Sequence, residues 1–363
     1  MNAADGRSLF MSKIAVLTSG GDSPGMNAAV TAIARCSNML GMSLVGVDRG
    51  FNGLLGKNPK SDFIDMSLEN ALDIADMAGT QLRTARCLEF KDPNVQAKAA
   101  QLLRDMDVRG LIVIGGDGSF QGAKALCNHG IPCIGIPGTI DNDLAYTGMT
   151  LGYDTAVNVC VDAVRNIRAT SRSHDRPHVV EVMGRHCGDI ALQTAMSTGA
   201  EIVICPEGKR WTVDSIARRL QSQIDQGNYR TTIVVAEGSW ELMAPFDVYE
   251  FLRPYGKQVF KGEPMTALRF ASVLKRKCKM PDGSFPEVRS TVVGYTQRGA
   301  RPTARDAAFA FEAGVRAVDL LNRGIGNRVI GRKNGKVFDE DIDKALRARR
   351  PFDRMMYNII NAL

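Results

Sequence analysis

Short apolar runs recur along the whole chain and commonly end in glycine or a polar residue. They lie at residues 14–18, 44–47, 111–114, 133–136, 179–183, 202–205, 233–236 and 291–293. Between them, apolar residues recur every three to four positions, which is the spacing of an amphipathic helix. These helical segments are 26–40, 95–106, 120–127, 155–167, 190–196, 213–224 and 304–321. Near-continuous apolar strands that alternate with helices are typical of a mainly parallel sheet covered on both faces. The pattern therefore predicts an α/β, doubly wound fold.

The same rhythm of strands and helices appears in both halves of the chain, so we expect two similar lobes with the active site in the cleft between them. The first lobe is expected at 13–150 and the second at 151–320, with an irregular insertion at 242–286. Residues 321–363 form a C-terminal helical segment that we expect to pack back on the first lobe. Ligands of open α/β sheets bind beyond the carboxyl ends of the strands, so the residues that follow each strand are candidates for chemistry.

The composition excludes several classes of protein. Hydrophobic residues make up 44% and charged residues 23% of the 363 positions, as in globular domains. No apolar run approaches the roughly 18–20 residues that span a bilayer, so we expect no membrane partner. The eight cysteines include no Cys-x-x-Cys pair, and the four histidines show no ligand spacing. We therefore expect reduced thiols in a cytoplasmic protein and no zinc site.

The charge balance is basic, because 46 Lys and Arg residues outnumber 39 Asp and Glu residues by 7. A basic protein suits anionic partners such as phosphorylated metabolites or nucleic acid. Aromatic residues make up only 6% of the chain and do not alternate with the basic clusters, so a platform for stacked bases is missing. Phosphorylated small molecules are therefore favoured over nucleic acid.

Two glycine-rich segments each follow a predicted strand and open a predicted helix. They are Thr-Ser-Gly-Gly-Asp-Ser-Pro-Gly-Met-Asn at 18–27 and Gly-Gly-Asp-Gly-Ser at 115–119. Glycines let backbone N–H groups approach a phosphate, and a helix N-terminus favours negative charge. Asp117 can also hold Mg²⁺ beside the phosphates. A plain tight turn is an alternative for the first segment, and lipid and NAD kinases also use a turn like the second.

A third segment, Pro-Gly-Thr-Ile-Asp-Asn-Asp at 137–143, again follows a predicted strand. Asp141 and Asp143 are two positions apart, so in an extended chain their carboxylates point to one side. Two carboxylates there can divide the work, one receiving a hydroxyl proton and the other assisting a metal. An Asx turn that caps a loop is the alternative interpretation.

Basic residues also gather near predicted strand ends. They are Arg86, Lys91, Arg176, Arg185, Arg289 and Arg298. So many cations exceed what a neutral ligand requires, and they suit a sugar phosphate together with a nucleotide polyphosphate. Each of them alone could equally be a surface ion-pair partner. Glu237 follows another strand and could accept hydrogen bonds from sugar hydroxyls.

In order and approximate spacing, these segments resemble the 6-phosphofructokinase family from Ile14 almost to the C-terminus. The resemblance rests on residues 16–29, 112–119, 137–143, 180–185 and 294–299 taken together. It implies a cytoplasmic kinase of glycolysis that moves the γ-phosphoryl group of ATP to O1 of fructose 6-phosphate, with Mg²⁺ as cofactor. Positioned cations and Mg²⁺ are a sufficient physical mechanism, because phosphoryl transfer needs little covalent help from the protein.

The resemblance also implies roles for individual positions. Asp141 is the expected base that accepts the 1-hydroxyl proton, and the expected catalytic set is completed by Asp143, Arg185 and Thr139. The expected Mg²⁺ ligand is Asp117. Contacts with ATP are expected from Gly21, Arg86, Cys87, Gly116, Asp117, Gly118 and Ser119. Contacts with the sugar phosphate are expected from Thr139, Ile140, Asp141, Arg176, Met183, Gly184, Arg185, Glu237, Arg289, Tyr295, Thr296, Gln297 and Arg298.

Arg176 and Arg289 match residues that members of the family borrow from a neighbouring subunit. The resemblance therefore implies self-association, as a homotetramer or a dimer. A non-catalytic metabolite-sensing subunit is a remote alternative, because such a subunit would have little reason to keep Asp117, Asp141 and Arg185 together.

The phosphoryl donor separates two branches of the family, one that uses ATP and one that uses pyrophosphate. The positions matching Gly118 and Gly138 are typically Asp and Lys in the pyrophosphate branch, where the carboxylate would crowd the α-phosphate of a nucleotide. Glycine at both positions favours ATP. Tyr295, where short bacterial ATP enzymes carry His, and the long 242–286 segment look like the pyrophosphate-like lineage. A pyrophosphate-dependent phosphotransferase is therefore the alternative.

In short bacterial relatives, an effector pocket between subunits binds ADP or phosphoenolpyruvate. Three residues match that pocket, namely Arg35, Arg168 and Glu201. Thr31, Phe51 and Met66 stand where an arginine, a tyrosine and another arginine are expected. The loss of two guanidinium groups removes charge-assisted bonds to phosphate, so we expect a weak or absent response to both effectors.

Overall fold

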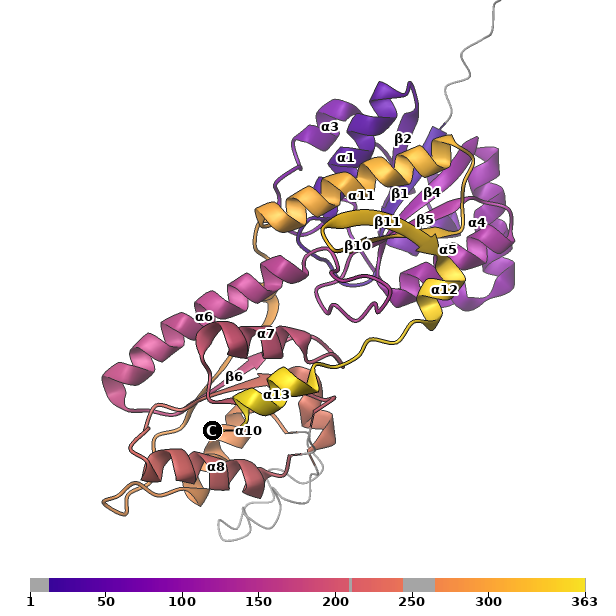
Figure 1. Cartoon of the computed structure of the whole chain (residues 1–363). Coiled ribbons are helices and arrows are strands. Elements are labelled where there is room, and N and C mark those ends of the chain that lie inside the picture. The colour runs from indigo at the N-terminus through magenta and orange to yellow at the C-terminus, as the bar shows by residue number, and fades with distance from the viewer. Residues whose placement is uncertain (1–12, 209–210, 244–264, 363) are drawn as a thin grey trace, which may run out of the picture. The chain divides into compact units, whose positions relative to one another are not determined.

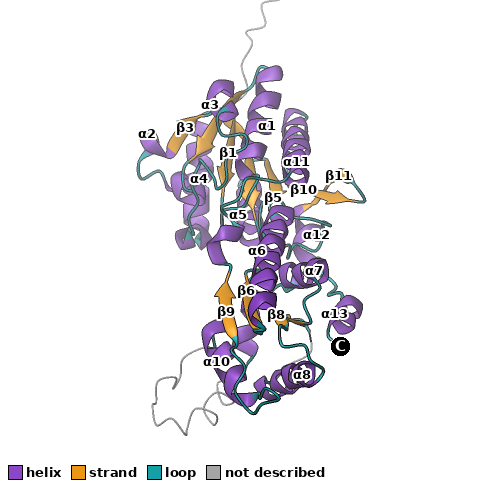
Figure 2. Ribbon diagram, turned by 90° about the vertical axis from the view of Figure 1, so that its left-hand side faces the viewer, coloured by secondary structure: helices purple, strands orange, loops and turns teal. Residues whose placement is uncertain are grey.

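The computed structural model describes residues 13–208, 211–243 and 265–362, and within them the chain forms two compact units (Figure 1). Unit 1 contains the described residues up to Ile140, together with Leu144–Asp154 and Arg301–Arg350. Unit 2 contains Asp141–Asp143, Thr155–Ala300 and the residues from Pro351 on. Each unit is an α/β layer structure in which helices cover a central sheet, as the ribbon in Figure 2 shows.

Unit 1 is built on a seven-stranded sheet in the order β11-β10-β5-β4-β1-β2-β3. Its strands are β1 (Lys13–Thr18), β2 (Ser43–Val47), β3 (Phe63–Asp65), β4 (Val108–Gly115), β5 (Cys133–Pro137), β10 (Arg328–Lys333) and β11 (Lys336–Asp341). The two edge strands, β3 and β11, run antiparallel to their neighbours, and the other pairs are parallel. Its helices are α1 (Met26–Met39), α2 (Pro59–Asp62), α3 (Leu68–Leu72), α4 (Pro93–Asp105), α5 (Asp117–Asn128), α11 (Ala304–Asn322) and α12 (Ile342–Arg347).

Successive side chains of the central strands enter two different cores. In β1, Ile14 and Val16 pack with α1 and α11 on one face of the sheet, whereas Ala15 and Leu17 pack with α4 and α5 on the other. Both faces are therefore dry, which explains why the strands read as unbroken apolar runs. The predicted doubly wound α/β fold is confirmed.

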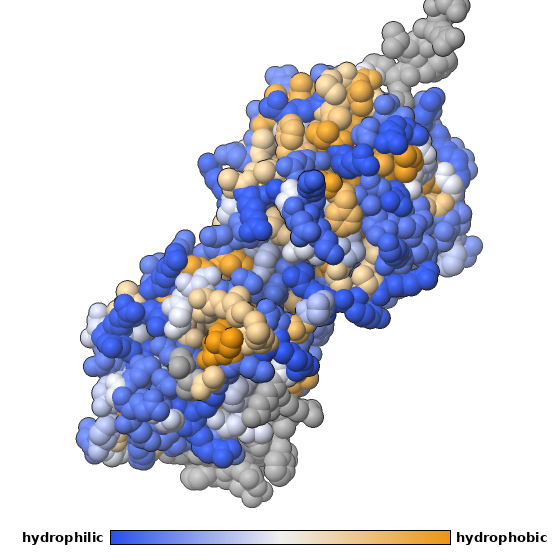
Figure 3. Space-filling model, in the orientation of Figure 1, coloured by the Kyte–Doolittle hydropathy of each residue, from blue (hydrophilic) through white to orange (hydrophobic). Residues whose placement is uncertain are grey.

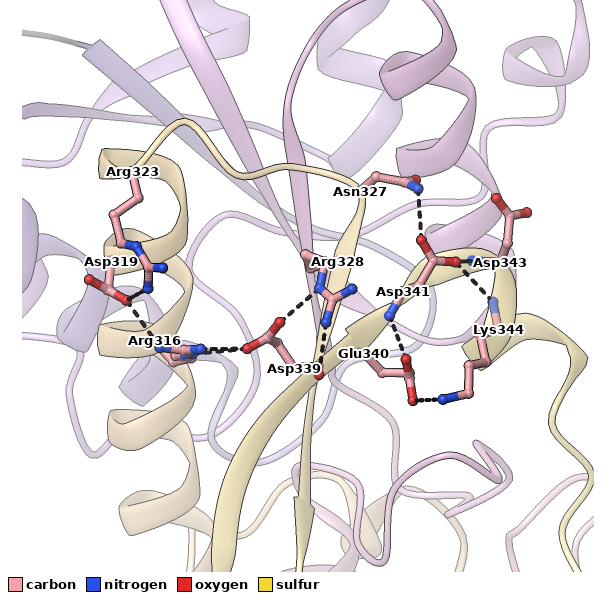
Figure 4. A network of polar contacts seen from close by, with 10 residues as sticks. All are labelled: Arg316, Asp319, Arg323, Asn327, Arg328, Asp339, Glu340, Asp341, Asp343 and Lys344. Atoms are coloured by element: carbon pink, nitrogen blue, oxygen red, sulfur yellow. Dashed lines mark hydrogen bonds and ion pairs between the residues drawn. The ribbon is translucent and has the colours of Figure 1, made fainter.

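Residues 301–350 belong to unit 1, which differs from the expected boundary at residue 320. The apolar face of α11 shares a core with α1, and β10 pairs in parallel with β5. A polar network secures the β10–β11 hairpin to α11 (Figure 4). In it, Asp339 accepts hydrogen bonds from Arg316 at 2.6 Å and from Arg328 at 2.7 Å. Within this range, residues 301–320 were expected in the second lobe, because the alternation of strands and helices does not show that α11 returns to the core of the first unit.

Unit 2 is built on a four-stranded, fully parallel sheet in the order β7-β8-β6-β9. Its strands are β6 (His178–Val182), β7 (Ile202–Ile204), β8 (Thr232–Ala236) and β9 (Arg289–Val292). Its helices are α6 (Tyr153–His174), whose first two residues lie in unit 1, α7 (Asp189–Thr198), α8 (Val213–Asp225), α10 (Ala267–Lys277) and α13 (Arg354–Ile360). One face of the sheet shares its core with α8 and α10. Helix α7 contacts β7 and β8, and α13 contacts α7 and β7.

The last helix, α13, packs on unit 2, whereas we expected the C-terminal segment to return to the first lobe. Tyr357 is 2% exposed, and its hydroxyl accepts a hydrogen bond from the indole N–H of Trp211 at 2.5 Å. Asn361 bonds through its side-chain amide to both the N–H and the C=O of Val203 in β7. Within the segment 321–363, α12 and the hairpin lie in unit 1, whereas Tyr357 and Asn361 hold α13 on unit 2.

The segment expected as an insertion, 242–286, lies partly outside the described residues, at 244–264. Its described part contains α10, whose Phe270 and Leu274 are fully buried in the core of unit 2. On the face drawn in Figure 3, hydrophilic residues predominate and groups of hydrophobic residues lie among them. Among the helices that the structure describes, none has the length and apolar character needed to cross a membrane.

Candidate active site

In unit 1, two glycine-rich turns lie side by side at the carboxyl ends of β1 and β4. The backbone N–H of Ser19 donates to the carbonyl of Ile114 at 2.9 Å, which ties the two strand ends together. A Cβ on Gly20 would lie 3.8 Å from the hydroxyl of Ser119, so the opening loop faces the start of α5. Parallel strands bring their carboxyl ends to one edge, and an α-helix beginning there presents its first N–H groups to an anion.

Three glycines at these turns have different surroundings. A Cβ on Gly115 would collide with the backbone of Ser19 and the side chain of Ser119, so close packing requires glycine there. A Cβ on Gly138 would lie 2.8 Å from Ile114, so this glycine also has a packing reason. Nothing lies within 4 Å of a Cβ on Gly118, which is exposed. Gly118 and Gly138 are the two positions that bear on the choice of donor. Packing against neighbours explains the glycine at 138, whereas no neighbour requires glycine at 118.

Asp117 begins α5 and is exposed at the same edge. One of its carboxylate oxygens accepts a hydrogen bond from the side chain of Gln121 at 2.8 Å. The described residues contain no cluster of three or more His, Cys, Asp or Glu that could enclose a metal ion. A single exposed carboxylate fits Mg²⁺, which is commonly held by one or two carboxylates together with substrate phosphates and water.

The segment that carries Arg86 and Cys87 is fastened to the opening loop. The hydroxyl of Thr84 donates to the carbonyl of Gly20 at 2.7 Å. Arg86 is exposed, and partial burial raises the pKa of the Cys87 thiol. The structure therefore brings together, within unit 1, the segments expected to contact a nucleotide.

An ion pair that the sequence analysis did not identify supports this segment. Arg83 donates from Nε to the buried carboxylate of Asp48 at 2.8 Å and makes a second bond to it through Nη2. Arg83 has a left-handed backbone with φ 54°, and its carbonyl accepts a hydrogen bond from Thr18 at the end of β1. Because the partners lie 35 positions apart, no local pattern marks them as a pair.

In unit 2, Asp141 is 9% exposed and lies among four charged side chains. Burial raises the pKa of Asp141 to about 6, and the nearby carboxylates of Asp143 and Glu237 act in the same direction. The guanidinium groups of Arg298 and Arg185 oppose the rise. Loss of hydration disfavours a buried anion more than these cations restore it. The result is a carboxylate that holds a proton far more readily than an ordinary aspartate.

The loop after β6 carries Arg185 in a left-handed conformation with φ 54°. Its backbone N–H donates to a carboxylate oxygen of Glu237 at 2.9 Å. Gly184 precedes it with φ 131°, and a Cβ on Gly238 would collide with the carbonyl of Arg185. Left-handed backbone at a non-glycine residue is costly and persists only where neighbours enforce it. Glu237, expected to contact the sugar, thus also shapes the loop that carries the cation.

The side chains of Gln297 and Ile140, two residues expected to contact the sugar phosphate, are both fully buried. Gln297 is fully buried, and its amide oxygen accepts from the N–H of Met183 at 3.2 Å and from the thiol of Cys160 at 3.0 Å. The side chain of Ile140 is fully buried as well. The amide of Gln297 thus joins two segments and holds the backbone of Met183, another residue expected to contact the sugar phosphate. By contrast, Tyr295 is 80% exposed.

Arg176 and Arg289 lie at the opposite edge of the sheet from Arg185. Both guanidinium groups pair with Glu287, Arg176 at 2.5 Å. Arg289 begins β9, where it is in register with His178 at the start of β6. Four residue steps along β6, about 13 Å, separate this edge from the end that leads to Arg185. Within one copy of the chain, these two arginines therefore lie at the other end of the strands from Arg185.

Together, the two units define a phosphate-handling α/β protein. Unit 1 offers glycine turns, a helix N-terminus and an exposed carboxylate, and unit 2 offers a buried carboxylate with raised pKa beside two guanidinium groups. Residues 13–321 match the phosphofructokinase family. The chain belongs to this family, which confirms the resemblance drawn from its motifs.

Individual relatives agree. The ATP-dependent 6-phosphofructokinase of Clostridium botulinum (strain Alaska E43 / Type E3) is 42% identical over 97% of this chain and 99% of its own length. The ATP-dependent 6-phosphofructokinase 1 of Clostridium perfringens is 43% identical over the same shares. Phosphofructokinase from Saccharomyces cerevisiae superposes with a TM-score of 0.76 at 30% identity, covering 92% of this chain and 45% of the yeast chain.

A pyrophosphate-dependent phosphofructokinase from Marinobacter aquaeolei shares the fold, with a TM-score of 0.74. It is 18% identical and covers 94% of this chain and 85% of its own. At that identity the similarity concerns the architecture alone, so the fold does not distinguish the two donors.

Proposed function

We propose that this chain transfers the γ-phosphoryl group of ATP to O1 of fructose 6-phosphate, giving fructose 1,6-bisphosphate. The clostridial relatives with this activity in their names align over almost the whole chain. The observation in the structure that carries the proposal is the buried carboxylate of Asp141, with its raised pKa and its two neighbouring guanidinium groups.

Asp141 acts as the general base. A carboxylate with a pKa of about 6 is mostly ionised at neutral pH and is still a stronger base than an ordinary aspartate. As the O1 oxygen of the sugar bonds to the γ-phosphorus, the bond from that phosphorus to the oxygen bridging the β- and γ-phosphates breaks, and ADP leaves. Asp141 accepts the proton of the 1-hydroxyl group, so this proton ends on its carboxyl group. Arg185 and Arg298 supply positive charge where negative charge is spread over the phosphoryl oxygens.

The turns of unit 1 hold the nucleotide. The first N–H groups of α5, from Gly116 to Ser119, suit phosphate oxygens, and Arg86 adds a cation beside them. Asp117 holds Mg²⁺, which neutralises charge on the phosphates when it is bound. The segment with Cys87 and the opening loop with Gly21 border the same edge.

ATP is the proposed donor because Gly118 is exposed and its surroundings are open. Pyrophosphate is the alternative to be tested. Purified protein is assayed side by side with MgATP and with Mg-pyrophosphate at saturating fructose 6-phosphate. Efficient turnover with MgATP supports the proposal. Efficient turnover with pyrophosphate and poor turnover with ATP would show that the donor is wrong, and no turnover with either would remove the enzymatic function.

We further propose that the working form is an oligomer, a homotetramer or a dimer, in which Arg176 and Arg289 of one copy serve the sugar phosphate of another. Their position at the opposite sheet edge from Arg185 supports this arrangement. Mixing provides the test. Asp141→Asn and Arg289→Ala variants, each nearly inactive alone, should regain activity when their subunits are exchanged, because some hybrid sites then have both native residues. Hybrids without activity would contradict the shared site.

A further inference from the structure

The turn that carries the two catalytic aspartates is fastened from outside the substrate contacts. The side-chain amide of Asn142 donates from Nδ2 to a carboxylate oxygen of Asp189 at 2.7 Å. Asn142 is 1% exposed and has a left-handed backbone with φ 53°. Asparagine tolerates that conformation better than most residues. The hydrogen bond thus reaches the central residue of Asp141–Asn142–Asp143, the point at which the backbone of this turn is least ordinary.

Asp189 is itself held in place. It is the first residue of α7, a position at which an acidic side chain interacts favourably with the helix dipole. The backbone N–H of Gly188, immediately before it, donates to both carboxylate oxygens of Glu207 at 2.9 and 3.0 Å. A Cβ on Gly188 would meet the side chains of Glu207 and Cys205, so the backbone is closely packed at this point. The start of α7 is therefore a firm anchor.

The start of α7 is connected directly to the loop that carries Arg185. Residues 183–188 join β6 to α7, and the N–H of Cys187 donates to the carbonyl of Gly184 at 2.8 Å to close the turn. One short stretch, 183–189, thus carries the cation at one end and the partner of Asn142 at the other. Because Arg185 has its own contact with Glu237, loss of the Asn142 contact would leave the cation loop in place.

We propose that Asp189 is a positioning residue for the phosphoryl-transfer reaction, acting through Asn142 to fix the direction and burial of the Asp141 carboxylate. This inference rests on the proposed function. A misplacement of about 1 Å in a catalytic group costs on the order of 10²-fold in rate. Asp189 touches neither expected substrate in this scheme, so its removal affects turnover more than binding.

The experiment compares Asp189→Ala with Asp189→Asn in the full chain. We expect Asp189→Ala to lower kcat by roughly 10- to 100-fold with little change in KM for fructose 6-phosphate. Asp189→Asn keeps an oxygen that can accept from Asn142, so most of the turnover should return. A matched control is Asp214→Ala, which removes the acidic residue of the first turn of α8 in the same unit. It should keep wild-type kcat.

A reciprocal exchange tests the contact itself. Asn142→Asp alone sets two carboxylates against each other and should be strongly impaired. Asn142→Asp combined with Asp189→Asn restores one amide and one carboxylate with the native net charge, and should be more active than the single variant. Thermal midpoints of all variants separate lost positioning from lost folding.

Two results would overturn the inference. One is wild-type kcat in a folded Asp189→Ala variant, and the other is an exchanged pair no more active than Asn142→Asp alone. Equal losses in Asp189→Ala and Asp214→Ala, in proportion to lowered thermal midpoints, would show that α7 only stabilises unit 2. These results differ from failure of the proposed function, in which the wild-type protein itself would not turn over MgATP and fructose 6-phosphate.

Discussion

Each unit carries one part of the proposed chemistry, and the two parts are built by opposite means. In unit 1, the phosphate side consists of turns with open surroundings, and Asp117, Gly118 and Arg86 are all exposed. In unit 2, the proposed base Asp141 and its neighbour Asn142 are buried although Asp143 is exposed, and Asn142 joins the turn to a helix start 47 positions away. Backbone N–H groups need no support beyond the turn that presents them, whereas a buried carboxylate needs neighbours that fix it and its charge. Short motifs therefore indicate the turns of unit 1 and the aspartates of unit 2, but not the distant contact that holds the buried turn.

The largest effect should come from the base of unit 2. Asp141→Asn keeps the shape of the side chain but removes its ability to take a proton, so kcat should fall by about 10²–10⁴-fold or more. Fructose 6-phosphate should still bind with nearly native affinity, as measured by calorimetry. A variant that retains more than half of wild-type turnover would remove Asp141 from the role of base.

In unit 1, the corresponding change is Gly118→Asp. Nothing lies within 4 Å of a Cβ at this position, so the variant should fold normally while its carboxylate repels the nucleotide phosphates. The specificity constant for ATP should fall far more than the affinity for fructose 6-phosphate. Gly118→Ala is the matched control, because it adds bulk without charge and should remain close to wild type. If the specificity constant for ATP falls equally in both variants, the size of the side chain at position 118, and not its charge, causes the loss.

The difference in burial also predicts a pH dependence that belongs to unit 2. Asp141 works as an anion, and burial raises its pKa to about 6. Turnover should therefore be constant near pH 8 and fall on the acid side of about pH 6, approaching tenfold per pH unit. Initial rates at saturating substrates across pH 5–8 provide the measurement. If turnover instead falls around pH 4, the pKa of Asp141 is close to its ordinary value. The carboxylate would then be more hydrated than its burial indicates.

Burial of Asp141 also affects the stability of the folded protein. The ionised carboxylate that the proposed reaction requires is the form that lowers this stability. Because the folded-state pKa of Asp141 lies above the ordinary value of 3.8, its anion destabilises the native state at neutral pH. This penalty disappears as the pH falls through about 6 towards 4. Asp141→Asn should raise the thermal midpoint at pH 8, by roughly 2–4 °C for each kcal/mol removed. The gain should vanish near pH 4, and a constant gain at both pH values would point to a cause other than ionisation.

The smallest effect concerns effectors. The guanidinium of Arg168 makes two hydrogen bonds to Glu201, at 2.9 and 3.1 Å, and is thereby already engaged. Three further positions matched to the effector pocket are buried in unit 1, namely Thr31, Phe51 and Met66. We therefore expect ADP and phosphoenolpyruvate to leave the saturation curve for fructose 6-phosphate almost unchanged. A clear shift at sub-millimolar effector, measured at subsaturating sugar phosphate, would contradict this.

The sequence was most informative where function depends on local chain geometry. The runs that became β1, β4 and β5, and the turns that follow them, could be placed from apolar patterning and glycine alone. It was less informative where partners are far apart along the chain. The pair Arg83 and Asp48, and the bond between Asn142 and Asp189, join segments whose proximity depends on the finished fold. No local spacing distinguishes them from ordinary surface residues.

The arginines near strand ends show a second limit. Arg176 and Arg185 both lie beside β6, but at opposite ends of it. The sequence pattern shows that a charged residue lies next to a strand. Whether that residue precedes or follows the strand decides at which end of the parallel strands it lies. The assignment of 301–350 to unit 1 has a similar cause, because β10 joins the sheet by pairing with β5, almost 200 positions earlier.

Asn361 covers backbone groups at an edge of the sheet in unit 2. Strand β7 is an edge strand of its sheet, and such an edge is a template on which a second chain can add a strand. The side-chain amide of Asn361 occupies both the N–H and the C=O of Val203, so it satisfies the groups that an incoming strand would use. Removal of the C-terminal segment that carries Asn361 would therefore uncover these two backbone groups at an edge to which a second chain can add a strand.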